Sequence, residues 1–152
     1  MIDVSIVVVT HDSSADLPAS LPSAAAQRGV SVETIVVDGA SRDDSIDVAR
    51  RLVPGVRVVA LPENVGFSAA MNAGIEASGG RYVLALNPDC RLAPDFAARL
   101  AARLDARPDV GSASGRIYRA DGPDLRPTTR LDSTGIVFHA SGRHFDRGSE
   151  ME

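Results

Sequence analysis

The sequence predicts an α/β protein with a mostly parallel sheet and helices on both faces, and two observations carry this prediction. Hydrophobic runs rich in β-branched residues alternate with stretches of helical periodicity, as in strands joined by crossover helices. These runs are mainly apolar, without a regular alternation of apolar and polar residues, which is typical of parallel strands buried on both faces. The chain has 152 residues, the length of one ordinary domain.

The elements follow one another in a regular order. Residues 4–9 are the first predicted strand, and residues 15–28 have helical spacing, in which Pro18 and Pro22 predict a short or kinked helix. The capping-box spacing of Ser41 and Asp44 predicts the start of the next helix. The other predicted elements are strands at 34–38, 56–61 and 81–86, and helices at 67–77 and from Pro94 to Pro108.

The character of the sequence changes after Gly115. Prolines and scattered arginines follow, and residues 135–138 and 143–146 flank Ala140-Ser141-Gly142 in the manner of a β-hairpin. We therefore expect an α/β part over residues 1–120 and a second region over residues 121–152.

Composition narrows the classes of function. The net charge is -4, and none of the 16 basic residues is lysine, so no overall positive field favours nucleic acid, and we expect no nucleic-acid partner. Cys90 is the single cysteine, which excludes an intrachain disulfide. The start lacks a basic leader and no apolar run is long enough to span a bilayer. We expect a cytoplasmic protein.

Polar residues gather where the predicted strands end. Ligands of open α/β sheets bind at the carboxyl ends of the strands, and four such loops are rich in carboxylates or amides. They are 10–12, 38–41, 64–66 and 87–89.

The usual phosphate-binding motifs are missing from these loops. Neither G-x-G-x-x-G nor the P-loop pattern occurs. Magnesium commonly takes one or two protein carboxylates and completes its shell with substrate phosphate and water. A lone Asp89 at a strand end therefore predicts an acidic loop that holds a diphosphate through a metal ion.

Four stretches in this order resemble the family 2 glycosyltransferases of GT-A fold, which is Rossmann-like, and in particular the rhamnosyltransferase-like branch. The stretches are 4–12, 35–41, 63–74 and 86–89. Residues 132–148 also resemble that branch, in which this region leads into the acceptor half. The resemblance implies that residues 1–120 form the nucleotide-sugar-binding half, that 121–152 begin the acceptor side, and that the chain is truncated before the acceptor half.

The resemblance also implies roles for individual residues. Asp38 would accept the ring N3–H of uracil or thymine, and Thr10 and Asp12 would frame the base and ribose. Asn87-Pro88-Asp89 stands where the family has its Asp-X-Asp metal motif, so Asp89 would hold Mg or Mn with one carboxylate fewer than usual. The residues expected to contact the nucleotide sugar are Thr10, Asp12, Asp38, Ser41, Asn64, Gly66, Asn72 and Asn87.

Each motif also has a structural interpretation. Asp38 could cap the following helix, 64–74 could be a turn before a helix packed through small residues, and Asn87-Pro88-Asp89 could be an ordinary turn. We interpret His139 and His144 as surface histidines, His11 as a packing residue, and Cys90 as a small buried hydrophobe rather than a nucleophile.

The resemblance predicts an inverting, metal-assisted glycosyltransferase that moves a sugar from a UDP- or dTDP-sugar to a glycan or lipid-linked acceptor. The alternative is a catalytically silent nucleotide-sugar-binding fragment or assembly module. We expect the catalytic base beyond Glu152 and therefore doubt that the chain alone transfers sugar. We also expect a homodimer, because the missing half would leave a sheet edge and apolar surface uncovered, and peripheral association with the inner membrane face.

Overall fold

The computed structural model describes residues 1–149 and divides the chain into two compact units, Met1–Ala101 and Ala102–Glu152. The division falls inside helix α4 (Phe96–Asp105), earlier than the expected boundary at residue 120. Ile117–Asp121 forms strand β5, which pairs with a later strand within the second unit. Residues 150–152 of the expected second region lie outside the described residues.

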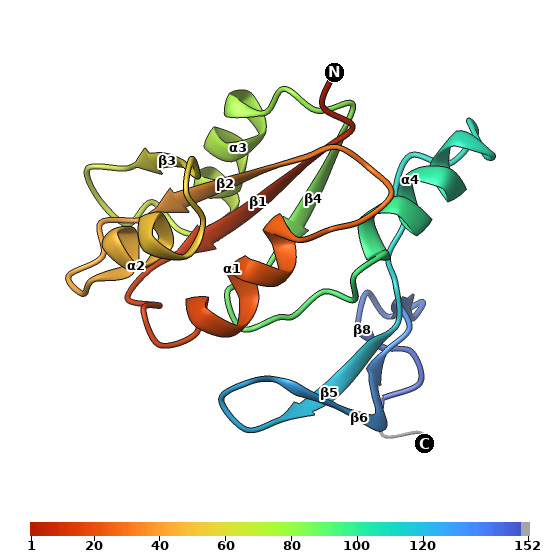
Figure 1. Cartoon of the computed structure of the whole chain (residues 1–152). Coiled ribbons are helices and arrows are strands. Elements are labelled where there is room, and N and C mark those ends of the chain that lie inside the picture. Colours follow the sequence, from red (N-terminus) through yellow and green to blue (C-terminus); the bar gives the residue numbers. More distant parts are fainter. Residues whose placement is uncertain (150–152) are drawn as a thin grey trace. The chain divides into compact units, whose positions relative to one another are not determined.

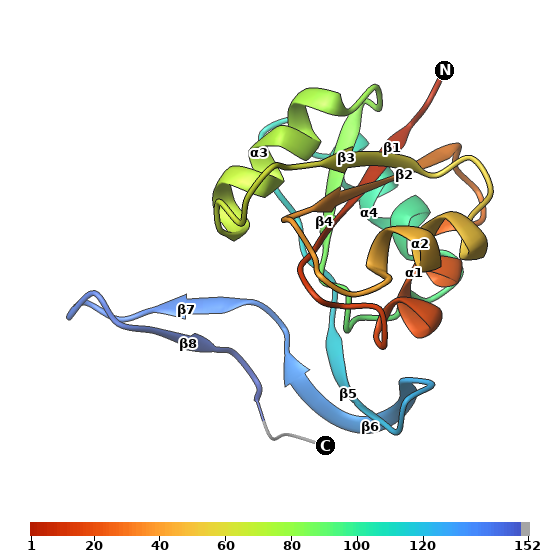
Figure 2. The same ribbon diagram turned by 90° about the vertical axis from the view of Figure 1, so that its left-hand side faces the viewer.

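The N-terminal unit, Met1–Ala101, is built on a four-stranded parallel sheet of order β3-β2-β1-β4 (Figure 1, Figure 2). Its strands are β1 Val4–Thr10, β2 Val32–Asp38, β3 Arg57–Ala60 and β4 Tyr82–Leu86. In register, Thr10 pairs with Asp38 and Val8 pairs with Leu86. The carboxyl ends of all four strands therefore share one edge of the sheet.

Helices cover both faces of this sheet. Helices α1 (Leu17–Ala25), α2 (Ser45–Leu52) and α4 pack on the face that carries Ile6 and Val8. Helix α3 (Phe67–Ala77) packs on the opposite face through Ala70 and Met71. The α/β class with a mostly parallel sheet is confirmed. No helix among residues 1–149 is both long and apolar enough to cross a membrane.

Of the two local features expected in the first half, the short helix is confirmed and the capping box is not. Helix α1 is short, as expected, with Pro18 in its first turn and Pro22 inside it. The capping box of Ser41 and Asp44 is wrong. Asp44 is the N-cap of α2 but makes no side-chain cap bond, and the Ser41 hydroxyl donates to Asp38 instead, at 2.5 Å.

The C-terminal unit contains two antiparallel pairs. Strand β5 pairs with β6 (Arg126–Ser133), and β7 (Ile136–Phe138) pairs with β8 (His144–Asp146), the expected hairpin (Figure 2). The β5–β6 pair was not predicted, because Pro123 and Pro127 indicate a loop. Phe138 and Phe145 are exposed on the hairpin.

Gly74 sets how closely α3 approaches the sheet. A Cβ there would lie 2.3 Å from Val7 Cγ1 and 2.9 Å from Val37 Cγ2, inside a buried interface. We expect Gly74→Ala to lower the free energy of unfolding by about 1–2 kcal/mol, since overpacking outweighs the better helix propensity of alanine. Urea titration followed by circular dichroism measures it. Glu76→Ala, at an exposed position of α3, is the control and should change little. A more stable Gly74→Ala would contradict this packing.

Candidate nucleotide-sugar site at the carboxyl edge of the sheet

Asp38 is the last residue of β2, and its side chain is buried at 2% exposure. Its Oδ1 accepts hydrogen bonds from the Thr10 hydroxyl at 3.0 Å and from the Ser41 hydroxyl at 2.5 Å. Its Oδ2 accepts from the Ser41 backbone N–H at 2.9 Å. A buried carboxylate needs such donors to offset its lost hydration, so this side chain is held in one orientation at the end of the sheet.

Asp12 lies in the loop after β1 and is tied to the loop after β2. Its backbone is left-handed, with φ 51°, a conformation that costs most L-residues about 1–2 kcal/mol. The Asp12 N–H donates to Ser41 Oγ at 2.9 Å, and Asp12 Oδ1 accepts from the Arg42 N–H at 2.6 Å. Ser41 thus joins Asp12 and Asp38, which are far apart in the sequence. The structure brings Thr10, Asp12, Asp38 and Ser41 into one hydrogen-bonded group.

His11 is not the packing residue that we expected. Its side chain is 45% exposed, so it does not belong to the core. Its Nδ1 lies 2.8 Å from the Gly39 carbonyl oxygen, which can only accept, so Nδ1 carries the proton. Nε2 points toward Asp12, at 3.9 Å from Oδ2. The only sequence signal for these contacts of His11 was its position next to Asp12.

The Asn64–Gly66 turn lies against the loop after β2. Asn64 Oδ1 accepts from the Gly66 N–H at 3.0 Å and lies 3.7 Å from where a Cβ on Gly39 would be. Gly66 has φ 81°, a left-handed conformation that glycine adopts without strain, and it is the N-cap of α3. Asn72 is exposed on α3, with no hydrogen bond to the Asp38 group.

Asn87 and Asp89 follow β4, the neighbour of β1 in the sheet, so they lie at the same edge as Asp38. Both side chains are exposed. Asp89 Oδ1 lies 3.7 Å from Cys90 Sγ, and Cys90 is partly buried against the core, close to our interpretation of it. Among residues 1–149 no three His, Cys, Asp or Glu side chains form a metal cluster. Asp89 fits a magnesium or manganese ion only if a diphosphate supplies other oxygens.

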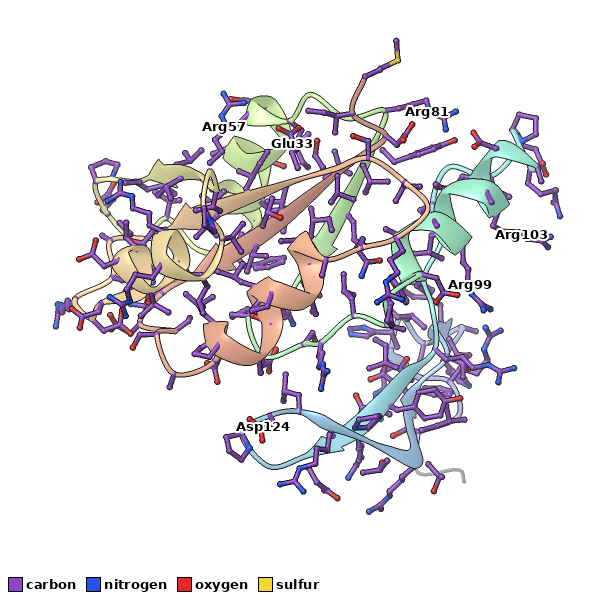
Figure 3. The ribbon with its side chains drawn as sticks, in the orientation of Figure 1. Glu33, Arg57, Arg81, Arg99, Arg103 and Asp124 are labelled. Carbon is purple, nitrogen blue, oxygen red and sulfur yellow. The ribbon has the colours of Figure 1, made fainter. Side chains whose placement is uncertain are left out.

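One hollow of this unit lies at the amino ends of strands β2 and β3, and none of the expected site residues lines it. Its lining includes Glu33 and Arg57, which are labelled in Figure 3. The pKa of Glu33 is lowered, first by the Ser5 hydroxyl and also by the N–H of Gly79 and the charge of Arg57. These contacts stabilise the amino edge, and we assign this hollow no ligand.

The two hairpin histidines lie on the surface, as expected. His139 and His144 are both exposed. His139 Nδ1 is 2.9 Å from Ser141 Oγ, and the His144 ring lies 6.2 Å from that of Phe138. Neither belongs to a group of three or more metal-ligating side chains among the described residues.

Comparison with known proteins decides the family. Residues 5–150 match the family model described as "Glycosyl transferase family 2". The chain belongs to this family. The succinoglycan biosynthesis protein ExoO of Rhizobium meliloti is 37% identical over 126 residues, which are 77% of this chain and 36% of that protein. The undecaprenyl-phosphate 4-deoxy-4-formamido-L-arabinose transferase of Pseudomonas aeruginosa is 34% identical over 152 residues, which are 91% and 44%. The chain therefore spans less than half the length of these relatives.

Solved structures show the same fold. S. aureus TarS 1-349 in complex with UDP-GlcNAc has a TM-score of 0.66 at 20% identity, over 89% of this chain and 39% of that one. The mannosyltransferase PcManGT of Pyrobaculum calidifontis, in complex with GDP-Man and Mn²⁺, has a TM-score of 0.61 at 21% identity, over 81% and 38%. These identities support the GT-A fold alone. The relatives named here belong to different kinds of family 2 enzyme, so membership of the rhamnosyltransferase-like branch stays a prediction.

Proposed function

We propose that this family 2 glycosyltransferase chain binds a UDP- or dTDP-sugar at the carboxyl edge of the sheet, for inverting transfer to an acceptor hydroxyl. The observation that carries the proposal is the buried Asp38 carboxylate, fixed by Thr10 and Ser41. A fixed carboxylate accepts hydrogen bonds but does not donate them. It therefore suits the N3–H donor of uracil or thymine and disfavours a base edge that presents a lone pair.

Asp12 and the Asn64–Gly66 turn border the Asp38 group, and we assign to them the contacts with the ribose and the sugar diphosphate. We assign to Asn72 and Asn87 contacts with the sugar and the diphosphate. Asp89 would help to hold Mg²⁺ or Mn²⁺, which neutralises charge on the departing diphosphate. In the transfer, the acceptor oxygen bonds to the anomeric carbon, the bond to the diphosphate breaks, and a base takes the hydroxyl proton. We assign that base to none of the described residues.

The comparisons support each part of this proposal to a different degree. TarS binds UDP-GlcNAc, whereas PcManGT binds a guanosine donor with Mn²⁺, so the same fold serves both kinds of base. The relative named for undecaprenyl phosphate supports a lipid-linked acceptor, and with it a cytoplasmic protein that associates with the inner membrane face. For the rhamnosyltransferase-like branch the proposal rests on the sequence motifs alone, because the relatives named above are of different kinds.

We further propose that two copies pair. Strand β4 is an edge strand of the sheet. Its residue Val83 lies on the sheet face against which α3 packs, and it is 42% exposed. A strand at the end of a sheet presents unpaired backbone groups, and a closed two-fold dimer is the commonest way to cover such a surface.

A binding measurement with the full chain tests the nucleotide part of the proposal. We expect UDP or dTDP, titrated calorimetrically with manganese present, to bind at least tenfold tighter than ADP, because adenine presents a lone pair at N1 instead of a ring N–H donor. CDP is the informative competitor, since cytosine presents a lone pair at N3. Equal affinity for UDP, CDP and ADP would contradict the role of Asp38.

A further inference from the structure

The loops after β1 and β2 are joined by five hydrogen bonds, which we call the loop clasp. Two are described above for Asp12, with Ser41 and Arg42, and a third joins His11 to Gly39. The other two join the Ser13 N–H to Ser45 Oγ, at 2.9 Å, and the Ser14 N–H to Asp43 Oδ2, at 2.9 Å. The clasp thus connects residues 11–14 to residues 39–45.

Asp43 takes part in the clasp through both carboxylate oxygens. Oδ2 accepts from Ser14 across the loops, while Oδ1 accepts from the Ser45 N–H at 3.0 Å and from the Ser45 hydroxyl at 2.5 Å. The Ser45 hydroxyl donates to Asp43 and accepts from Ser13, and Ser45 is fully buried. Removing the Asp43 carboxylate therefore affects both Ser13 and Ser14.

The loop clasp connects the starts of two helices. Ser14 stands three residues before α1, and Ser45 begins α2, so Asp43 fixes the start of one helix on the start of the other. Between Thr10 and Ser13 the chain contains Asp12 in its left-handed conformation. A left-handed non-glycine residue persists only where its surroundings impose it. The bonds at Ser13 and Ser14 supply one such constraint.

The charge of Asp43 suits this role. The Ser45 hydroxyl, with help from the Ser14 N–H, holds the pKa of the Asp43 carboxyl far below its usual range. Hydrogen bonds that favour the charged form of an acid lower its pKa. Asp43 therefore remains an acceptor on both oxygens at neutral pH, and hydrogen bonds to charged groups are the stronger ones.

We propose that Asp43, which our sequence analysis did not single out as a site residue, is a positioning residue of the donor site. It holds the loop after β1 so that Asp12 and Thr10 face the base and ribose of the nucleotide sugar. The inference rests on the proposed function of this edge, since it concerns how the same site is kept in its binding geometry. Asp43 itself need not touch the donor.

Asp43→Asn tests the proposal with little change in volume. An asparagine side chain has one acceptor oxygen, so it can keep the bonds to Ser45 or the bond to Ser14 but not both. We expect the UDP dissociation constant of the full chain to rise about tenfold, which corresponds to the loss of one hydrogen bond to a charged group. The dissociation constant of uridine should rise by the same factor, because the loop clasp holds the residues that we assign to the base and ribose. Asp43→Ala should raise the UDP dissociation constant more than Asp43→Asn does.

Amide hydrogen exchange supplies the readout that a general loss of stability would not reproduce. Exchange should accelerate in residues 12–16 of Asp43→Asn and stay slow in β1 and β2. Asp44→Asn is the matched control: it removes the same charge from the adjacent, exposed residue, which makes no cap bond. That control should bind UDP as the wild type does, with unchanged exchange.

The outcomes separate the two proposals. A wild-type chain that binds no pyrimidine diphosphate would overturn the proposed function, and this inference with it. A wild type that binds UDP beside an Asp43→Asn variant that binds equally well would overturn the inference alone. Faster exchange spread evenly over β1, β2 and the loops would also overturn it, since that pattern indicates a general loss of stability.

Discussion

Asp38→Ala is expected to weaken UDP binding about 100-fold, the largest effect of any single change at the site. The carboxylate is 2% exposed and held by Thr10 and Ser41, so its orientation costs nothing further when the base binds. Truncation removes the acceptor for the base N–H and leaves a buried donor on the ligand unpaired, a loss of roughly 1.5–3 kcal/mol that reorganisation of the two partners increases. Calorimetry with UDP and manganese measures it.

The same truncation removes the acceptor of three protein donors, so stability has to be followed alongside binding. Asp38→Asn keeps the volume and one acceptor, and we expect it to retain the fold while the preference for UDP over CDP falls. Asp47→Ala, an exposed aspartate on α2, is the control for the lost charge. An Asp38→Asn variant with the affinity and base preference of the wild type would show that Asp38 only supports the loops.

Asp89→Ala is expected to abolish the metal dependence of UDP binding. The affinity in manganese should fall at least tenfold, about 1.4 kcal/mol, to the value that the wild type shows in EDTA. The reason is that one exposed carboxylate and the diphosphate must complete each other's coordination of the ion. Calorimetry in manganese and in EDTA gives the comparison.

Binding of uridine distinguishes the contribution of the metal ion from that of the base. Because uridine has no phosphate, the wild type and Asp89→Ala should bind it with the same affinity. Asp38→Ala should bind both uridine and UDP more weakly than the wild type does. Asp95→Ala, six residues along the chain and paired with Arg99, is the charge control. If Asp89→Ala retains full metal-dependent affinity, the metal is held by other groups and the assignment of Asp89 is wrong.

The main elements of the first unit could be predicted because their signals are local. The run at residues 4–9 is mainly apolar and β-branched, and a polar segment follows it, so the sequence predicts both the strand and its carboxyl end. The same holds for β2, β3 and β4, whose observed bounds differ from the predicted ones by a residue or two. The β5–β6 pair was missed because the prolines that mark its turn and its second strand read as loop.

The site was predicted as a set of positions, not as an arrangement. Asp38 and Asp89 were expected at the carboxyl edge of the sheet, and both lie there, because parallel strands place these ends together. Ser41 was expected both as a site residue and as a helix cap, and only tertiary contact showed that its hydroxyl serves Asp38. His11 was expected to pack, yet the loop after β2 holds it at the surface.

The sequence alone therefore determined which residues stand at the ends of which strands, since backbone propensity and hydrophobic pattern act over a few neighbouring residues. Only the tertiary structure decided which of those residues meet. Thr10 reaches Asp38 across 28 positions, and Asp43 reaches Ser14 across 29. These pairs depend on the register of β1 against β2 and on loop conformations such as the left-handed Asp12. Such conformations are stabilised by partners far away in the chain, and no local pattern records them.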